Sequence, residues 1–166
     1  FAYVIDISGS MDESRMTALK REVITSISGL LEHAKFTVIT YNSDAESLTE
    51  SRWYVADQRN KRAAESEIAV LIGQYGTKPS KAFTMVSRMR PRADAIYFMT
   101  DGQIGSEEEG RLVRQVNTMN RGSGVRTRVH CITFMNKDSE QFMRRLARMT
   151  GGTYTHIAGP GWRGGS

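Results

Sequence analysis

The chain opens with Phe1-Ala2-Tyr3-Val4-Ile5 and runs directly into Asp6-Ile7-Ser8-Gly9-Ser10-Met11. The opening run is apolar and predicts a buried strand. Three side chains after it carry oxygen atoms, those of Asp6, Ser8 and Ser10, and the intervening glycine favours a tight loop. Hard oxygen ligands that converge in this way are typical of a site for a hard cation such as Mg²⁺.

The same residues also fit a plain strand that is followed by a helix cap. Ser10 or Asp12 would cap the next helix, and Glu13 would complete a capping box after Ser10. The loop alone does not separate the two interpretations, so the rest of the chain has to decide.

Length and composition indicate a single globular domain. The chain has 166 residues, of which 39% are hydrophobic and 25% are charged, and this composition excludes a disordered chain. No apolar run is long enough to span a membrane, and no signal-peptide pattern is present. Because the sequence begins inside a strand and without Met, we expect it to be a piece of a longer protein. Cys131 is the single cysteine and lies in an apolar run, which predicts a buried thiol and no internal disulfide.

The net charge of +5 raises the question of nucleic-acid binding. The densest basic groups are at 59–62, 88–92 and 144–148, on separate predicted elements. Solvated helix faces account for such groups, so we do not expect a nucleic-acid site.

Strands and helices alternate along the chain. Strands are predicted at 1–5, 35–41, 51–55, 95–100, 125–134 and 153–157 from their apolar and β-branched runs. Helices are predicted at 14–32, 60–72, 79–89, 107–120 and 139–149 from apolar residues at helical spacing. Residues 159–166 form a glycine-rich tail or linker after a domain at 1–158.

This alternation predicts an α/β fold with a mostly parallel, doubly wound sheet and helices on both faces. Ligands of such sheets bind beyond the carboxyl ends of the strands, where the winding direction reverses. Two predicted strands end in an aspartate that begins a loop, Asp6 and Asp101. If these strands are neighbours, both carboxylates reach one crevice.

In this order the motifs resemble the von Willebrand factor type A domain, over nearly the whole chain. The family's Asp-x-Ser-x-Ser signature of the metal-ion-dependent adhesion site stands here as Asp6, Ser8 and Ser10. The family's later motifs match Gly76-Thr77, Thr100-Asp101-Gly102 and Thr150-Gly151-Gly152-Thr153-Tyr154.

The resemblance implies a Rossmann-like, six-stranded sheet in the order 3-2-1-4-5-6, with the short third strand antiparallel at an edge. It also implies ligand roles: Ser8 and Ser10 bind the cation through their hydroxyls, Thr77 binds directly or through water, and Asp6 and Asp101 act through water. Mg²⁺ or Mn²⁺ is the expected ion, ahead of Ca²⁺. Family members with a known conformational switch carry a helix after the last strand, where this sequence has Ala158 and the glycine-rich tail.

The implied function is that of a metal-dependent protein-binding module, because two carboxylates and neutral hydroxyls leave a bound Mg²⁺ electrophilic. One coordination position would accept an Asp or Glu side chain of a partner protein. The alternative is a helper subunit or domain of a chelatase- or ATPase-type assembly, which would use the same site. The sequence does not fix the compartment, although an extracellular, periplasmic or cell-surface location is favoured.

An enzyme is the rival class. A phosphoryl-accepting aspartate at Asp6 would need a second acid and a strand-end lysine, and no lysine stands in a matching place. No Gly-x-x-x-x-Gly-Lys-Ser/Thr loop is present, and His33, His130 and His156 lie far apart. A Ser-His-Asp set stays open as an alternative, but Ser8 and Ser10 fit better as metal ligands. We therefore expect no catalysis.

Overall fold

The computed structural model of the chain describes residues 1–9, 11–101, 103–122 and 124–158. The strands are β1 (Ala2–Asp6), β2 (Lys35–Tyr41), β3 (Ala45–Ser47), β4 (Tyr54–Val55), β5 (Ala95–Thr100), β6 (Arg128–Phe134) and β7 (Tyr154–Ile157). The helices are α1 (Glu13–Ser28), α2 (Gln58–Ala69), α3 (Pro79–Arg88), α4 (Ser106–Met119) and α5 (Glu140–Thr150). None of the helices in the described part of the chain is long and apolar enough to cross a membrane.

One sheet organises the molecule, with the strand order β3-β2-β1-β5-β6-β7. Strand β1 lies parallel to β2 on one side and to β5 on the other, and β5, β6 and β7 continue in parallel. The winding therefore reverses between β1 and β5, which confirms the predicted doubly wound sheet. It also makes the strands that carry Asp6 and Asp101 neighbours.

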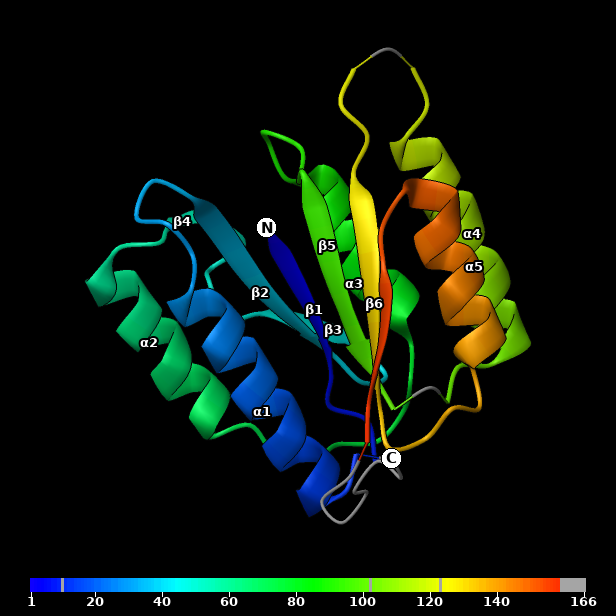
Figure 1. Cartoon of the computed structure of the whole chain (residues 1–166), viewed down its shortest axis with the longest axis horizontal. Coiled ribbons are helices and arrows are strands. Elements are labelled where there is room, and N and C mark those ends of the chain that lie inside the picture. The colour runs from blue at the N-terminus through cyan, green and yellow to red at the C-terminus, as the bar shows by residue number, and fades with distance from the viewer. Residues whose placement is uncertain (10, 102, 123, 159–166) are drawn as a thin grey trace, which may run out of the picture.

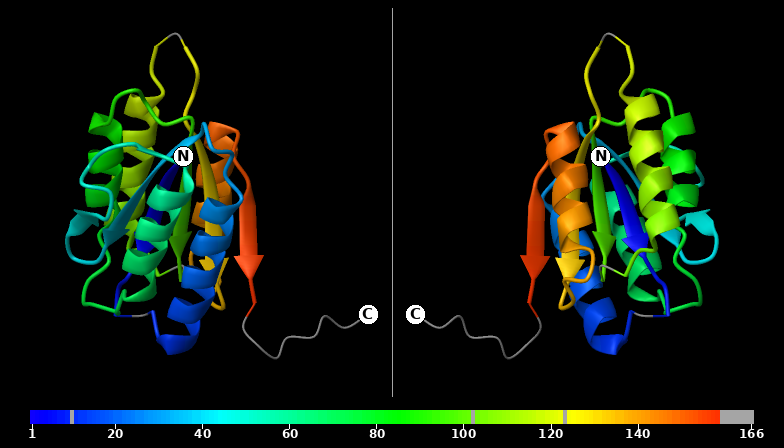
Figure 2. Two further views of the ribbon diagram at one scale, coloured as in Figure 1. Left: turned by 90° about the vertical axis from the view of Figure 1, so that its left-hand side faces the viewer. Right: turned by 90° about the vertical axis from the view of Figure 1, so that its right-hand side faces the viewer.

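Helices cover both faces of the sheet (Figure 1). One layer consists of α1 and α2, and the other consists of α3, α4 and α5, as the two side views show in turn (Figure 2). Successive residues of β1 alternate between the two cores: Tyr3 and Ile5 pack with the α1 layer, while Ala2 and Val4 pack with the α3 layer. A strand that is buried on both faces reads as one continuous apolar run, which is why the opening residues are so hydrophobic.

The edge of the sheet beyond β2 differs from the prediction. The predicted strand at 51–55 is shortened to β4, and β3 forms a second short strand; both pair antiparallel with β2. Glu50 and Ser51 adopt left-handed φ values of 52° and 55°, so the chain turns between the two strands. Only Tyr54 and Val55 are then left to pair with the start of β2.

Two helices end earlier than predicted. Helix α1 stops at Ser28, because Gly29 caps it and donates its backbone N–H to the Thr25 carbonyl oxygen. Helix α2 stops at Ala69, and Ile72, expected on its buried stripe, is 71% exposed instead. The predicted tail at 159–166 lies outside the described residues.

Candidate metal centre

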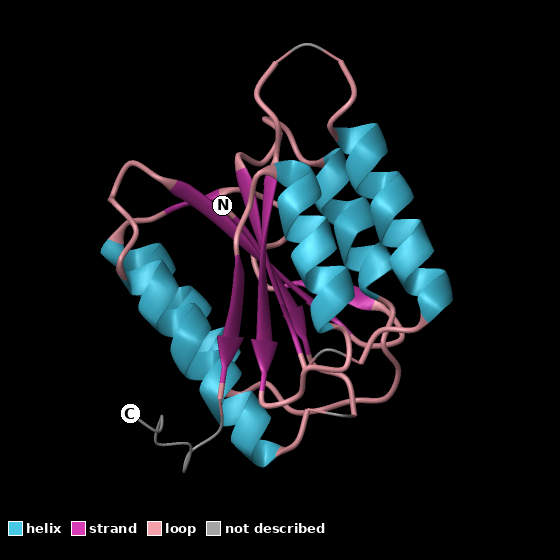
Figure 3. Ribbon diagram, turned by 45° about the vertical axis from the view of Figure 1, so that its right-hand side comes forward, coloured by secondary structure: helices cyan, strands magenta, loops and turns pink. Residues whose placement is uncertain are grey.

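The carboxyl ends of the central strands meet at one edge of the molecule, the lower edge in Figure 3. Asp6 is the last residue of β1, and Asp101 directly follows β5. Both side chains are fully buried, with an exposure of 0%, and Ser8 is 1% exposed. The fold thus buries two carboxylates near the ends of adjacent strands, where an ionised group is destabilised unless a positive charge balances it.

Hydrogen bonds hold the Asp6 carboxylate in place. Its Oδ1 accepts the backbone N–H of Ser8 over 2.7 Å, and its Oδ2 accepts the Thr100 hydroxyl over 2.7 Å. Burial raises the pKa of Asp6, the bonds from Ser8 and Thr100 oppose that rise, and the charge of Asp101 adds to it. Burial and the neighbouring Asp101 thus both disfavour the negative charge of Asp6.

Asp101 has a different set of partners. Its Oδ1 accepts the backbone N–H of Gln103 over 3.1 Å, and its Oδ2 accepts Nη1 of Arg15 over 3.2 Å. Arg15 was not among the residues predicted for the site. Its only signal is a basic residue in the first turn of a helix, where the helix dipole disfavours positive charge.

The start of α1 resolves the alternative about helix capping. Asp12 is the N-cap, and its Oδ1 accepts the Arg15 backbone N–H over 2.9 Å. Asp12 is one of the two caps that the plain interpretation named, whereas the Ser8 backbone N–H bonds back to Asp6. Ser10, the third residue of the predicted signature, lies outside the described residues.

Thr77 is carried to the same edge by the loop between α2 and α3. Backbone bonds fasten this loop to the ends of β1 and β2: Gln74 N–H to the Ile7 oxygen at 2.6 Å, and Lys78 N–H to the Asn42 oxygen at 2.7 Å. Thr77 itself is partly buried and lies two residues before Pro79, the first residue of α3.

Tyr41, the last residue of β2, lies opposite Asp6 in the sheet register. The sequence reading assigned it to a strand and gave it no part in the site. Burial first, and then the charge of Asp6, raises the pKa of the Tyr41 hydroxyl well above its usual value. The hydroxyl therefore stays protonated and adds no negative charge beside Asp6.

The oxygen atoms gathered here suit a hard divalent cation. The described residues contain no cluster of three or more His, Cys, Asp or Glu side chains that would hold a metal. The candidate set has two carboxylates only, and its other oxygens are hydroxyls of Ser8 and Thr77. Carboxylate and hydroxyl oxygens are the ligand types that Mg²⁺ and Mn²⁺ prefer in proteins.

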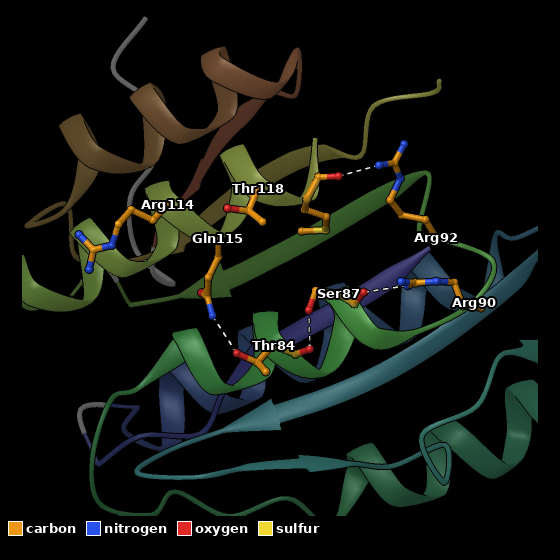
Figure 4. Close-up of a pocket in the computed structure, with 8 residues that line it drawn as sticks. Thr84, Ser87, Arg90, Arg92, Arg114, Gln115 and Thr118 are labelled. Atoms are coloured by element: carbon orange, nitrogen blue, oxygen red, sulfur yellow. Dashed lines mark hydrogen bonds between the residues drawn. The ribbon is translucent and has the colours of Figure 1, made fainter. Parts of the chain in front are cut away.

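Apart from this site, a concavity of 710 Å³ lies between α3 and α4, and no carboxylate lines it (Figure 4). Arg90 and Arg92 lie at one end of it and Arg114 at the other. Arg90 donates to the carbonyl oxygens of Ser87 and Met89 at 2.9 and 2.8 Å, and Arg92 donates to the Met119 carbonyl at 2.6 Å. These two guanidinium groups satisfy carbonyls at helix ends, which explains them without a ligand.

The sequence profile of the von Willebrand factor type A domain matches residues 2–156. The chain belongs to this family. Type A domains are in general interaction modules. A comparison with curated protein sequences gave no match.

Several solved structures share the fold. A von Willebrand factor type A protein from Catenulispora acidiphila is 25% identical with a TM-score of 0.82, over 94% of this chain and 38% of that one. BatB from Bacteroides thetaiotaomicron is 18% identical with a TM-score of 0.72, over 95% of this chain and 89% of that one. Proximal thread matrix protein 1 from the mussel byssus, described with a zinc-occupied adhesion-site motif, is 13% identical with a TM-score of 0.68, over 95% and 41% of the two chains. This chain thus spans 38% of the length of the Catenulispora protein.

Proposed function

We propose that this type A domain binds one Mg²⁺ or Mn²⁺ through Asp6, Ser8, Ser10, Thr77 and Asp101, and that the ion captures an acidic side chain of a partner protein. The observation that carries the proposal is the pair of fully buried carboxylates at the ends of adjacent strands. A divalent cation beside them gives a site with almost no net charge. One further carboxylate can then replace a water on the ion without like-charge repulsion.

The residues around the proposed metal site favour an anionic ligand. The N-terminus of α1 opens at the same edge, and the positive end of a helix dipole attracts negative charge. Lys78 is exposed on the loop that carries Thr77, and it adds to the attraction of an acidic surface without touching the ion.

The proposal includes no catalysis. The Ser8 backbone N–H bonds to Asp6. His130 is hydrogen-bonded to Thr153, which directly precedes β7, and His156 is hydrogen-bonded to Thr133 of β6. Ser8 and these two histidines therefore have different hydrogen-bond partners. Adhesion and assembly of a multi-subunit complex would use the same chemistry, so the identity of the partner distinguishes those two roles.

The experiment is capture of a partner in Mg²⁺, followed by variants of the domain. Thr77→Ala, Asp6→Ala and chelator should each abolish binding, and one Asp or Glu of the partner should be equally essential. Thr155→Ala and Asp94→Ala serve as matched controls, because both side chains are exposed and lie away from the crevice. Binding that persists in chelator, with the fold intact, would show that the ion is structural and that capture is wrong.

A further inference from the structure

Arg15 reaches across the crevice from α1 to the end of β5. Its Nη1 lies 3.2 Å from Oδ2 of Asp101, which is 86 residues away in the sequence. Its Nε also lies 3.8 Å from Oδ2 of Asp12, the cap of its own helix. The Arg15 side chain is 21% exposed, whereas Asp101 is fully buried.

The energetics of the helix do not explain a cation at this position. Arg15 is the third residue of α1, where the helix dipole favours negative charge and disfavours positive charge. The favourable interaction that offsets this disadvantage is the contact with Asp101, because a bond between two charged groups strengthens where water is excluded.

The contact also offsets the electrostatic cost of burying two carboxylates close together. Asp6 and Asp101 are both buried, and Asp101 contributes to the raised pKa of Asp6. When no metal is bound, the guanidinium of Arg15 places a positive charge in direct contact with Asp101, one member of this pair. A guanidinium stays charged at every physiological pH, so it supplies that charge permanently.

We propose that Arg15 is a built-in counter-cation that holds the metal-free site together and that a divalent cation has to displace from Asp101. This inference rests on the proposed metal-binding function. A divalent ion and a guanidinium that share one carboxylate repel each other, so metal binding and the Arg15–Asp101 contact compete. Since Arg15 is partly exposed, its side chain can turn to solvent without disturbing the core.

Arg15 therefore sets the affinity of the site in two opposite ways. It stabilises the domain without metal, and it weakens the binding of the metal. A higher concentration of divalent ion is then needed to fill the site, because the Arg15–Asp101 contact already stabilises the metal-free state.

The test compares Arg15→Gln with Arg21→Gln. Both substitutions remove one arginine charge from α1, but Arg21 is exposed and away from the crevice. Two quantities are measured for each purified variant: the urea midpoint of unfolding in chelator, and the dissociation constants of Mn²⁺ and Mg²⁺ by calorimetry. Arg15→Lys, which keeps the charge on a shorter side chain, provides the conservative variant should Arg15→Gln fold poorly.

Arg15→Gln should lower the urea midpoint in chelator and tighten metal binding about tenfold or more. Arg15→Lys should fall between Arg15→Gln and the wild type in both measurements, and Arg21→Gln should match the wild type. If the wild type binds metal and Arg15→Gln binds it equally or more weakly, the counter-cation role of Arg15 is wrong, while the proposed metal-binding function still stands. Failure of every variant to bind Mn²⁺ or Mg²⁺ overturns both this inference and the proposed function.

Discussion

Thr100 donates a hydrogen bond from its Oγ1 to Oδ2 of Asp6 over 2.7 Å and so joins the ends of β5 and β1. Both groups are fully buried. The other oxygen of Asp6 accepts the Ser8 backbone N–H, so both carboxylate oxygens are oriented before any ion arrives. A carboxylate held in this way acts on a cation from a fixed position, and little side-chain entropy is lost on binding.

Thr100→Val should destabilise the metal-free domain by about 1–3 kcal/mol, because it removes a hydrogen bond to a buried carboxylate while keeping the shape of the side chain. Urea denaturation in chelator measures the loss. Thr155→Val makes the same change at an exposed position of β7 and should have little effect. Equal unfolding free energies for the two variants would show that the bond does not stabilise the fold.

Divalent metal should stabilise the wild-type domain, and above the dissociation constant the gain should rise with the logarithm of the metal concentration. At about 100 times the dissociation constant, Mg²⁺ or Mn²⁺ should add ~2.7 kcal/mol to the free energy of unfolding, because the unfolded chain lacks the site. Thermal melts with and without chelator measure the effect, and Asp101→Asn should remove it. A melting temperature that is indifferent to metal would contradict the predicted ligand set.

Gly76→Ala should damage the site without touching a predicted ligand. Gly76 has a φ of +90°, and a Cβ there would lie 2.6 Å from the Ser43 Cβ, so the loop that carries Thr77 has to shift. Gly122→Ala is the matched control, since Gly122 has a φ of +97° but open space around its Cβ position. Both should lose the ~1–2 kcal/mol that a left-handed backbone costs, and only Gly76→Ala should also weaken metal binding. Equal metal affinities would show that the loop tolerates the shift.

The alternating α/β pattern predicted that two buried strands end in Asp6 and Asp101, but it left open whether these strands are neighbours. The resemblance to the type A domain supplied the strand order that makes them so. Neither was sufficient for Arg15. Helical periodicity places that side chain off the buried face, but its reach to Asp101 depends on how the loop before α1 is folded. Contacts across 86 residues leave no periodic trace in the sequence.

The short strand β3, the true extent of β4 within the predicted strand at 51–55, and the end of α2 were not predicted, for a related reason. Strands β3 and β4 have three and two residues, too few to show the alternation that marks a strand. Ile72 continues the apolar spacing of α2, but the chain leaves the helix after Ala69 so that Gln74 can bond to Ile7. Tertiary fastening of the Thr77 loop therefore overrides the local pattern there.

Acid should destabilise the domain through His130. Burial first, and then the charge of Arg128, lowers the pKa of His130, and its Nδ1 accepts the Thr153 backbone N–H over 3.1 Å. A lowered pKa means that the unfolded chain binds the proton more readily, so stability falls as the pH drops from about 6.5 towards the folded-state pKa. Unfolding free energies measured between pH 7 and pH 5 should fall less steeply for His130→Gln than for wild type. The same slope in both proteins would contradict this origin of the acid sensitivity.

The arginines between α3 and α4 should stabilise helix ends and should not bind nucleic acid. Arg92 donates to the carbonyl oxygens of Met119, at the end of α4, and of Val125, in the loop that follows, so Arg92→Ala removes the donor to both and should cost about 1–2 kcal/mol. Arg114→Ala, at the exposed end of the same concavity, removes the same charge and should change stability little.

Because Arg92 is engaged with backbone oxygens and the carboxyl ends of helices are negative, the concavity is a poor site for phosphates despite its charge. Fluorescence anisotropy with labelled DNA and RNA at physiological salt should show no tight binding. Tight binding with a steep salt dependence, weakened by both substitutions, would instead identify this concavity as a nucleic-acid surface.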